Sequence, residues 1–163
     1  MTIAVYAGTF DPLTLGHLSV VKTAVRLFAH VRVLVAVHPD KQTLFTLEER
    51  IALAREVVGA MPTVSCDGTG GMVVDYARAI GATVLVRGLR GEADAAYETR
   101  LAQANRELGP EILTVMLPSD PALSMVSSSE LKRRARAGAP IDAFCPPAVA
   151  EKLLARLAER GDA

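Results

Sequence analysis

The residues best suited to chemistry stand in one segment near the amino terminus, which reads Gly-Thr-Phe-Asp-Pro-Leu-Thr-Leu-Gly-His over residues 8–17. An apolar run at residues 3–7 leads into it, and a stretch of helical periodicity follows it. The order predicts a strand, a loop and a helix start, where backbone N–H groups and the helix dipole together stabilise a phosphate. His17 adds an imidazole that can donate to phosphate oxygens as their charge grows. The segment therefore predicts a nucleotide-handling site.

Further polar side chains follow the other apolar runs of the chain. In open α/β sheets ligands bind beyond the carboxyl ends of the strands, so these positions come next. Lys41 follows the second run, and Arg87 and Arg90 follow the fourth, at a spacing that lets two guanidinium groups fork onto phosphate oxygens. The serines at 127–129 open a helical stretch and offer hydroxyls as well as N-caps. Taken singly, these residues are also typical of a solvated lysine, a surface ion pair and a helix cap. Together they predict an anion site.

The elements that must position these residues alternate along the chain. We expect strands at residues 3–7, 31–37, 63–66, 83–86 and 112–117. We expect helices at residues 16–29, 46–57, 71–80, 95–108, 127–138 and 148–160, with a capping box formed by Thr46 and Glu49. Such alternation is typical of a parallel sheet with helices on both faces. The sequence predicts one α/β domain, a doubly wound five-stranded parallel sheet over residues 1–160, with residues 161–163 as a frayed tail.

The bulk composition excludes several classes of protein. The 163 residues contain 18 Lys plus Arg and 18 Asp plus Glu, so no overall charge favours nucleic acid or an anionic membrane. The apolar runs are short, which argues against a signal peptide or a membrane span and predicts a soluble, cytoplasmic protein. Cys66 and Cys145 stand far apart without metal-ligand spacing, so we expect both to be reduced and buried and expect no protein metal site. We expect no functional role for His30 and His38.

Two short motifs carry a resemblance to a known family. Thr14-Leu15-Gly16-His17 resembles the [His/Thr]-x-Gly-His element of the nucleotidyltransferase superfamily, and residues 8–12 resemble its strand-loop lead-in. Three further blocks, at residues 45–50, 86–90 and 126–129, make almost the whole chain similar to the bacterial phosphopantetheine adenylyltransferases. The resemblance implies a Rossmann-like nucleotidyltransferase fold. It also implies reversible transfer of an adenylyl group from ATP to 4′-phosphopantetheine, which yields dephospho-coenzyme A and pyrophosphate in coenzyme A biosynthesis.

The resemblance also implies the partners and the role of each site residue. It implies Mg²⁺ carried by ATP, a homohexamer, feedback inhibition by coenzyme A, and neither a nucleic-acid nor a membrane partner. The implied catalytic residues are His17 and Lys41, and the residues implied to bind phosphopantetheine are Thr9, Lys41, Val73 and Arg87. Those implied to bind ATP are Thr9, Phe10, His17, Gly88, Leu89, Arg90, Glu98, Leu123, Ser124, Met125, Val126, Ser127, Ser128 and Ser129. Leu123 and Met125 depart from the aromatic residues frequent in the family, which predicts different stacking near the nucleotide.

Two alternatives stay open at this point. One is another nucleotidyltransferase, such as a cytidylyltransferase or a nicotinamide mononucleotide adenylyltransferase. The other is a nucleotide-binding regulator without turnover. The serines at 127–129 favour the phosphopantetheine branch over the first alternative, and the presence of His17, Lys41, Arg87 and Arg90 together argues against the second.

Overall fold

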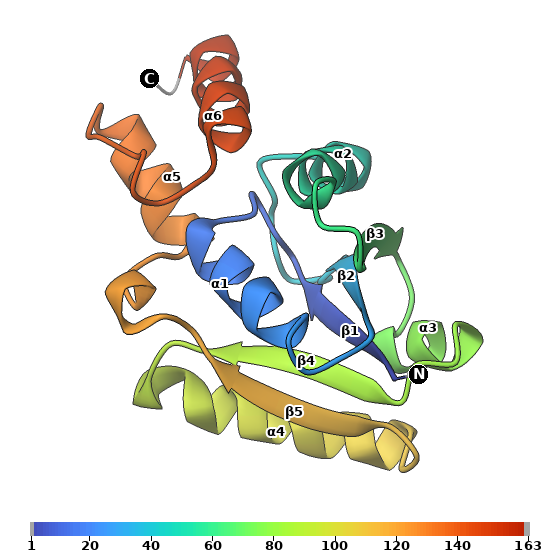
Figure 1. Cartoon of the computed structure of the whole chain (residues 1–163). Helices are drawn as coiled ribbons and strands as arrows, with labels where there is room; N and C mark the ends of the chain where they lie inside the picture. Colours follow the sequence, from blue (N-terminus) through green and yellow to red (C-terminus); the bar gives the residue numbers. More distant parts are fainter. Residues whose placement is uncertain (1, 162–163) are drawn as a thin grey trace.

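A five-stranded parallel sheet forms the centre of the computed structural model, which describes residues 2–161 (Figure 1). The strands are β1 (Ile3–Gly8), β2 (His30–Ala36), β3 (Val64–Thr69), β4 (Val84–Leu89) and β5 (Leu113–Pro118). Their order across the sheet is β3-β2-β1-β4-β5, and β1 pairs with both β2 and β4. The chain thus winds outward from β1 in one direction and then, from β4, in the other. This confirms the predicted doubly wound sheet and places a switch point between β1 and β4, where such folds bind ligands.

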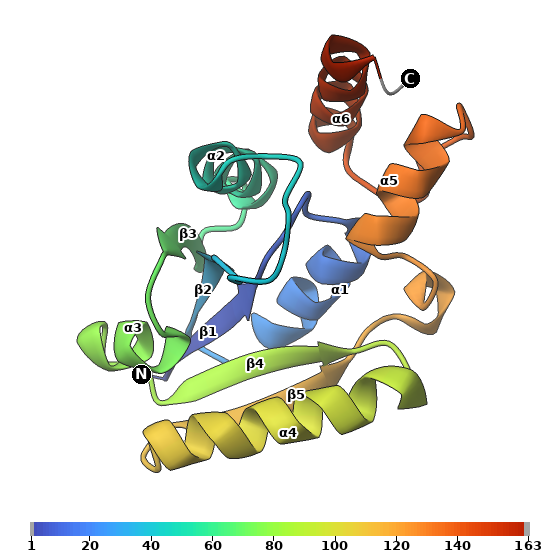
Figure 2. The same ribbon diagram turned by 180° about the vertical axis from the view of Figure 1, so that it is seen from behind.

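Helices cover both faces of this sheet. They are α1 (Leu15–Ala24), α2 (Leu47–Val58), α3 (Val73–Ala79), α4 (Glu92–Leu108), α5 (Ser128–Arg136) and α6 (Pro147–Arg160), with a short 3₁₀ helix, η1 (Pro121–Leu123). Alternate β1 side chains point to opposite faces, so Ala4 and Tyr6 join the core beneath α1 and α2, whereas Val5 and Ala7 join the core beneath α3. Helix α4 runs along β4 and β5 (Figure 2). None of the helices described is long and apolar enough to cross a membrane.

Two helix boundaries differ from the prediction by three residues or more. Helix α1 ends at Ala24 instead of residue 29, because the backbone tightens there: the N–H groups of Arg26 and Leu27 donate to the carbonyls of Thr23 and Ala24 at 3.1 and 3.0 Å. Helix α4 starts earlier than residue 95, at Glu92, and its first turn carries acidic side chains that complement the positive end of the helix dipole.

The helix caps bear out the local sequence signals. The hydroxyl of Thr46 accepts from the Glu49 N–H at 3.2 Å, and the Glu49 carboxylate accepts from the Thr46 N–H at 2.8 Å, which confirms the capping box. The hydroxyl of Ser127 caps α5 by accepting from the Glu130 N–H at 3.1 Å. Gly161, the first residue of the predicted frayed tail, caps α6 at a left-handed φ of 68°; residues 162 and 163 lie outside the described residues.

A separate apolar cluster fixes α5 and α6 against α2. The residues buried in it are Leu44, Phe45, Leu53, Leu131, Ala135, Ile141, Cys145, Val149, Leu153 and Leu157. Three of them recur at every fourth position of α6, which is the spacing of one helix face. Both cysteines are free and buried, as expected: Cys145 lies in this cluster and Cys66 in the core beneath α2. The cluster sets the orientation of α5, whose amino terminus carries the serines.

Truncation in this cluster should weaken the whole fold. Leu153 is 0% exposed, so we expect Leu153→Ala to lower the free energy of unfolding by about 2–5 kcal/mol, through lost burial and the cavity left behind. Its neighbour Leu154 is 49% exposed and gives a matched control, for which we expect a change of about 0.5 kcal/mol. Urea denaturation of the two variants measures both values, and equal losses would contradict the packing described.

Candidate active site

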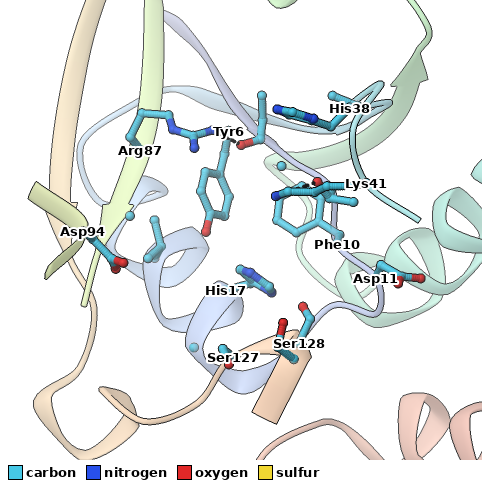
Figure 3. Close-up of a pocket in the computed structure, with 18 of the residues that line it drawn as sticks. Tyr6, Phe10, Asp11, His17, His38, Lys41, Arg87, Asp94, Ser127 and Ser128 are labelled. Carbon is cyan, nitrogen blue, oxygen red and sulfur yellow. Dashed lines mark hydrogen bonds between the residues drawn. The ribbon is translucent and has the colours of Figure 1, made fainter. Parts of the chain in front are cut away.

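A cavity of about 660 Å³ opens at the carboxyl ends of β1, β2 and β4 (Figure 3). The volume is in the range of pockets that bind small molecules. The loop after β1, the start of α1, the loop after β2, the first turns of α4 and the start of α5 all contribute to its wall. The cavity therefore lies at the switch point of the sheet, where the fold predicts a ligand.

Most of the predicted site residues line this cavity. They are Thr9, Phe10, His17, Lys41, Val73, Arg87, Gly88, Arg90, Glu98, Val126, Ser127, Ser128 and Ser129. Four predicted ATP contacts do not line it: Leu89, Leu123, Ser124 and Met125. Ser124 and Met125 instead line an adjoining shallow pocket together with Arg90 and Ser127, and the Met125 side chain is 77% exposed. Leu89 and Leu123 line neither pocket, and the predicted contact of all four residues with the nucleotide stays a prediction.

The imidazole of His17 projects into the cavity between Tyr6 and Ser128 (Figure 3). The backbone N–H of Thr14 donates to Nδ1 at 3.0 Å, as part of the capping box that starts α1. An Nδ1 that accepts a hydrogen bond carries no proton, so in the neutral ring the proton is on Nε2. The ring of Phe10 packs edge-on against the imidazole, with 5.0 Å between ring centroids. These contacts fix one tautomer and one orientation of the ring, with Nε2–H as its hydrogen-bond donor.

The surroundings keep His17 uncharged near neutral pH. Burial lowers the pKa of His17 to about 4, because it penalises the charged form, and the positive charges of Arg90 and Arg87 act in the same direction. The side chain is therefore neutral at pH 7, where it offers Nε2–H as a hydrogen-bond donor and is too weakly basic to serve as a strong general base. That role suits hydrogen bonding to an oxygen whose negative charge grows in a transition state.

The lowered pKa of His17 predicts a pH dependence of stability. Since the folded pKa lies below the unfolded value of about 6.5, the unfolded chain binds the extra proton first, and stability is lost as the pH falls from about 6.5 to about 4. The loss from this one residue is on the order of 3 kcal/mol. We expect the free energy of unfolding to fall less between pH 7.5 and pH 4.5 in His17→Gln than in wild type. Urea titrations at both pH values measure this, and identical falls would remove His17 as the cause.

Arg87 and Arg90 are each held by a carboxylate of α4. Arg87 forms a two-pronged pair with Glu98, at 2.6 Å from Nε and 2.9 Å from Nη2, and its Nη1 donates to the Ala7 carbonyl at 2.6 Å. Arg90 pairs with Asp94 through Nε and Nη2, both at 2.9 Å. Asp94 and Glu98 are four residues apart and so share one face of the helix. Helix α4 thus positions both guanidinium groups at the cavity wall.

The pairing leaves donors of both arginines for a ligand. A guanidinium group has five N–H groups. Arg87 uses three of them in the contacts above, which leaves two, and Arg90 uses two, which leaves three. Glu98 itself is 8% exposed and both of its carboxylate oxygens accept from Arg87, so its direct effect in this structure is to orient that arginine. Its predicted contact with ATP stays a prediction.

The remaining predicted groups come from the loops after β1 and β2 and from α5. The Lys41 Nζ lies 3.5 Å from the Thr9 hydroxyl, which brings both side chains to the same side of the cavity. The hydroxyl of Ser128 donates to the Pro12 carbonyl at 2.9 Å and so ties the start of α5 to the first loop. The amino terminus of α5 is thereby directed at the cavity, with its backbone N–H groups and serine hydroxyls (Figure 3).

The cavity wall also contains polar residues that the sequence analysis did not select. They are Tyr6, Asp11, His38, Gln42, Thr43, Asp94, Tyr97, Ser119 and Lys132. His38 lines the cavity, and the expectation that it has no functional role stays a prediction, whereas His30 lies elsewhere and shares a hydrogen bond of 2.7 Å with Ser65. Helical spacing could have identified Lys132, because it lies four residues after Ser128 and therefore on the same helix face.

Known proteins are similar to this chain over most of its length. The family model described as cytidylyltransferase-like matches residues 5–134. A protein of Levilactobacillus brevis named phosphopantetheine adenylyltransferase is 43% identical over 96% of this chain and 98% of its own length. Proteins of the same name from Herpetosiphon aurantiacus and Methylococcus capsulatus are 45% and 44% identical, over 92% and 97% of this chain and 91% and 98% of their own lengths.

A solved structure extends the likeness to the fold. It belongs to a protein of Vibrio parahaemolyticus titled a putative nicotinate-nucleotide adenylyltransferase, and it matches with a TM-score of 0.70 over 99% of this chain and 95% of that one. At 18% identity, the match shows the fold alone. The full-length relatives go further: at 43–45% identity, they show that the chain belongs to the phosphopantetheine adenylyltransferase family of cytidylyltransferase-like proteins.

Proposed function

We propose that the chain transfers the adenylyl group of ATP to the terminal phosphate of 4′-phosphopantetheine, a step of coenzyme A biosynthesis, in the cavity described above. The observation that carries the proposal is the gathering, in one cavity, of His17, Lys41, Arg87, Arg90 and the amino terminus of α5. These groups come from the carboxyl end of β4 and from the segments that follow β1, β2, β4 and β5. A single phosphate needs fewer hydrogen-bond donors than these groups supply, whereas a triphosphate together with a second anion provides a partner for each group.

The reaction is an in-line displacement at the α-phosphorus of ATP. An oxygen of the acceptor phosphate forms a bond to that phosphorus, and the bond to the bridging oxygen breaks, so that pyrophosphate leaves with the electron pair. The acceptor phosphate needs no strong general base, because its second pKa is about 6 and it is largely ionised near pH 7. Catalysis then consists of positioning and of stabilising negative charge. The lowered pKa of His17, about 4, fits a hydrogen-bond donor in such a scheme.

Each group has a distinct part in this scheme. His17 and Lys41 stabilise charge at the α-phosphate, and Arg87 orients the acceptor phosphate, with Thr9 and Val73 on the same substrate. Arg90 and the serines at 127–129 hold the pyrophosphate end of ATP. Arginine suits the two ends because its planar fork contacts two phosphate oxygens at once.

Magnesium enters this scheme as part of the ATP substrate. Among residues 2–161, no group of three or more His, Cys, Asp or Glu side chains is arranged to hold a metal ion. The carboxylates at the cavity wall, Asp11, Asp94 and Glu98, pair with Lys132, Arg90 and Arg87, which would leave the ion to water and to the phosphates themselves. We propose that Mg²⁺ arrives bound to ATP and lowers the repulsion between the triphosphate and the incoming anion.

The family membership also supports proposals about assembly and control. We propose that the chain works in the cytoplasm as a homohexamer and that coenzyme A, which contains the product's structure, inhibits it by occupying the same cavity. Light scattering tests the assembly. A titration of the reaction with coenzyme A against varied phosphopantetheine tests the inhibition.

A pyrophosphate-release assay tests the function itself. We expect rapid release with ATP and 4′-phosphopantetheine, and little release when CTP replaces ATP or when nicotinamide mononucleotide replaces the acceptor. The reverse reaction, ATP formation from dephospho-coenzyme A and pyrophosphate, provides a second measurement. Faster release with CTP or with nicotinamide mononucleotide would assign the chain another nucleotidyltransferase activity. Binding of ATP without pyrophosphate release in any mixture would indicate a nucleotide-binding regulator.

A further inference from the structure

A buried carboxylate joins three segments of the chain at one edge of the cavity. Asp11, in the loop after β1, accepts from the backbone N–H groups of Leu44 and Phe45, at 2.9 and 3.0 Å. The same carboxylate accepts from the ammonium group of Lys132, on α5, at 2.6 Å. The loop that carries Thr9, the loop that carries Lys41 and the helix that starts at the serines thus meet at a single side chain.

The environment makes this contact a rigid one. The side chains of Asp11 and Lys132 are 5% and 17% exposed, so the pair is largely shielded from water. Leu44 and Phe45, whose N–H groups Asp11 accepts, are 5% and 3% exposed and lie in the apolar cluster beneath α5 and α6. Buried N–H groups need partners and a buried carboxylate needs a counter-charge, and this arrangement provides both.

The contact lies close to the reacting groups along the chain. Leu44 follows Lys41 by three residues, and Asp11 follows Thr9 by two. The Lys41 ammonium group lies 3.5 Å from the Thr9 hydroxyl. Lys132 lies one helical turn after the serines at 127–129. A second buried side chain, Arg50, reinforces the same junction by donating to the Thr9 carbonyl at 2.7 Å. Displacement of Asp11 would therefore shift the base of the Lys41 loop relative to α5.

We propose that Asp11 and Lys132 form a positioning pair, which holds Lys41 at the α-phosphate in register with the triphosphate contacts of α5. The proposal rests on the proposed function, since it assigns these residues a part in that reaction. Neither residue touches the reacting atoms. Their effect passes through the position of Lys41, and misplacement of a catalytic group by about 1 Å costs on the order of 100-fold in rate.

A double-mutant cycle on kcat tests this dependence. We expect Asp11→Asn to lower kcat by about 100-fold in the wild-type background. In a Lys41→Ala background the same substitution should cost only about twofold, which is within the usual error of additivity. Asp142→Asn, an exposed aspartate away from the cavity, is the matched control and should leave kcat unchanged in both backgrounds. Equal losses from Asp11→Asn in both backgrounds would overturn the proposal, because Asp11 would then act independently of Lys41.

Hydrogen exchange supplies a readout that does not depend on turnover. We expect faster exchange of the Leu44 and Phe45 amides in Lys132→Met, together with a lower kcat, and recovery of most of both losses in Lys132→Arg, which restores the charge. Lys152→Met, an exposed lysine on α6, is the control. Unchanged exchange combined with a raised KM for ATP in Lys132→Met would overturn the proposal, since Lys132 would then contact the triphosphate directly.

The two proposals fail in distinguishable ways. If the wild-type protein releases no pyrophosphate from ATP and phosphopantetheine, the proposed function fails. If wild type turns over but the cycle is additive, only the positioning pair fails. If Asp11→Asn does not fold, the Lys132 variants and their exchange measurements still decide the matter, because they leave the carboxylate and its two backbone partners in place.

Discussion

We expect the His17→Ala protein to turn over at least about 100-fold more slowly than wild type, with little change in the KM for either substrate. The magnitude is that of losing one hydrogen-bond donor aimed at charge that develops in the transition state. KM should change little because the neutral Nε2–H strengthens its contact only as the oxygen gains charge. Steady-state pyrophosphate release over a range of both substrates measures kcat and KM separately.

The matched control keeps a donor at the same place. His17→Gln retains an N–H group on a side chain of similar length, so we expect it to recover part of the rate lost in His17→Ala. The helix start should survive both substitutions, because the hydroxyl of Thr14 still accepts from the residue 17 N–H, at 3.3 Å in the wild type. An unchanged kcat in a folded His17→Ala protein would remove His17 from the mechanism.

The second large effect is expected at Arg87, and it combines stability with turnover. Arg87→Met leaves the Glu98 carboxylate, whose side chain is 10% exposed, without its counter-charge. Breaking a buried pair in this way costs about 3–5 kcal/mol of the free energy of unfolding. Turnover should fall as well, because the acceptor phosphate loses its fork of donors. Urea denaturation and the release assay measure the two losses on the same preparations.

A compensating variant separates the two effects. In Arg87→Met/Glu98→Met no buried charge remains, so the stability should return to within about 1–2 kcal/mol of wild type, whereas turnover should stay low. The exposed pair of Arg133 and Glu130 provides the control: Arg133→Met should change the free energy of unfolding by about 1 kcal/mol or less. Recovery of full turnover in the double variant would show that Arg87 does not serve the acceptor phosphate.

The sequence predicts the sheet better than it predicts the ends of the helices. Apolar runs identify all five strands, because the central strands β1, β2 and β4 are largely buried and read as nearly continuous hydrophobic stretches. The edge strand β3 is more polar and ends at Thr69, three residues later than predicted. Apolar spacing continues past the end of α1 through Val25 and Phe28, both of which pack against the core although the chain there no longer forms an α-helix. Periodicity reports which side chains are buried, whereas the end of a helix depends on which carbonyl each N–H reaches.

Some residues of the candidate site can be predicted from local sequence, and others depend on contacts between distant elements. Residues within the short motifs, such as His17 and the serines, come to the cavity because the end of a strand or the start of a helix carries them there. The pairing of Arg87 with Glu98 joins β4 to α4, and no local pattern could have predicted it. The resemblance implies Leu123 and Met125 as nucleotide contacts; neither lines the main cavity, and Met125 lines the adjoining shallow pocket, so their role stays a prediction.

Because the strand order reverses between β1 and β4, the active site forms only when the amino-terminal and carboxyl-terminal portions of the chain associate. Thr9, His17 and Lys41 precede α3, whereas Arg87, Arg90 and the serines follow it. Within the sheet the two portions meet at the β1–β4 junction, where Ala4 pairs with Val84 and Tyr6 pairs with Val86. Neither portion of the polypeptide, produced alone, holds a whole catalytic centre. Turnover recovered by mixing the separate portions would therefore measure the association of the two portions, including the pairing of β1 with β4.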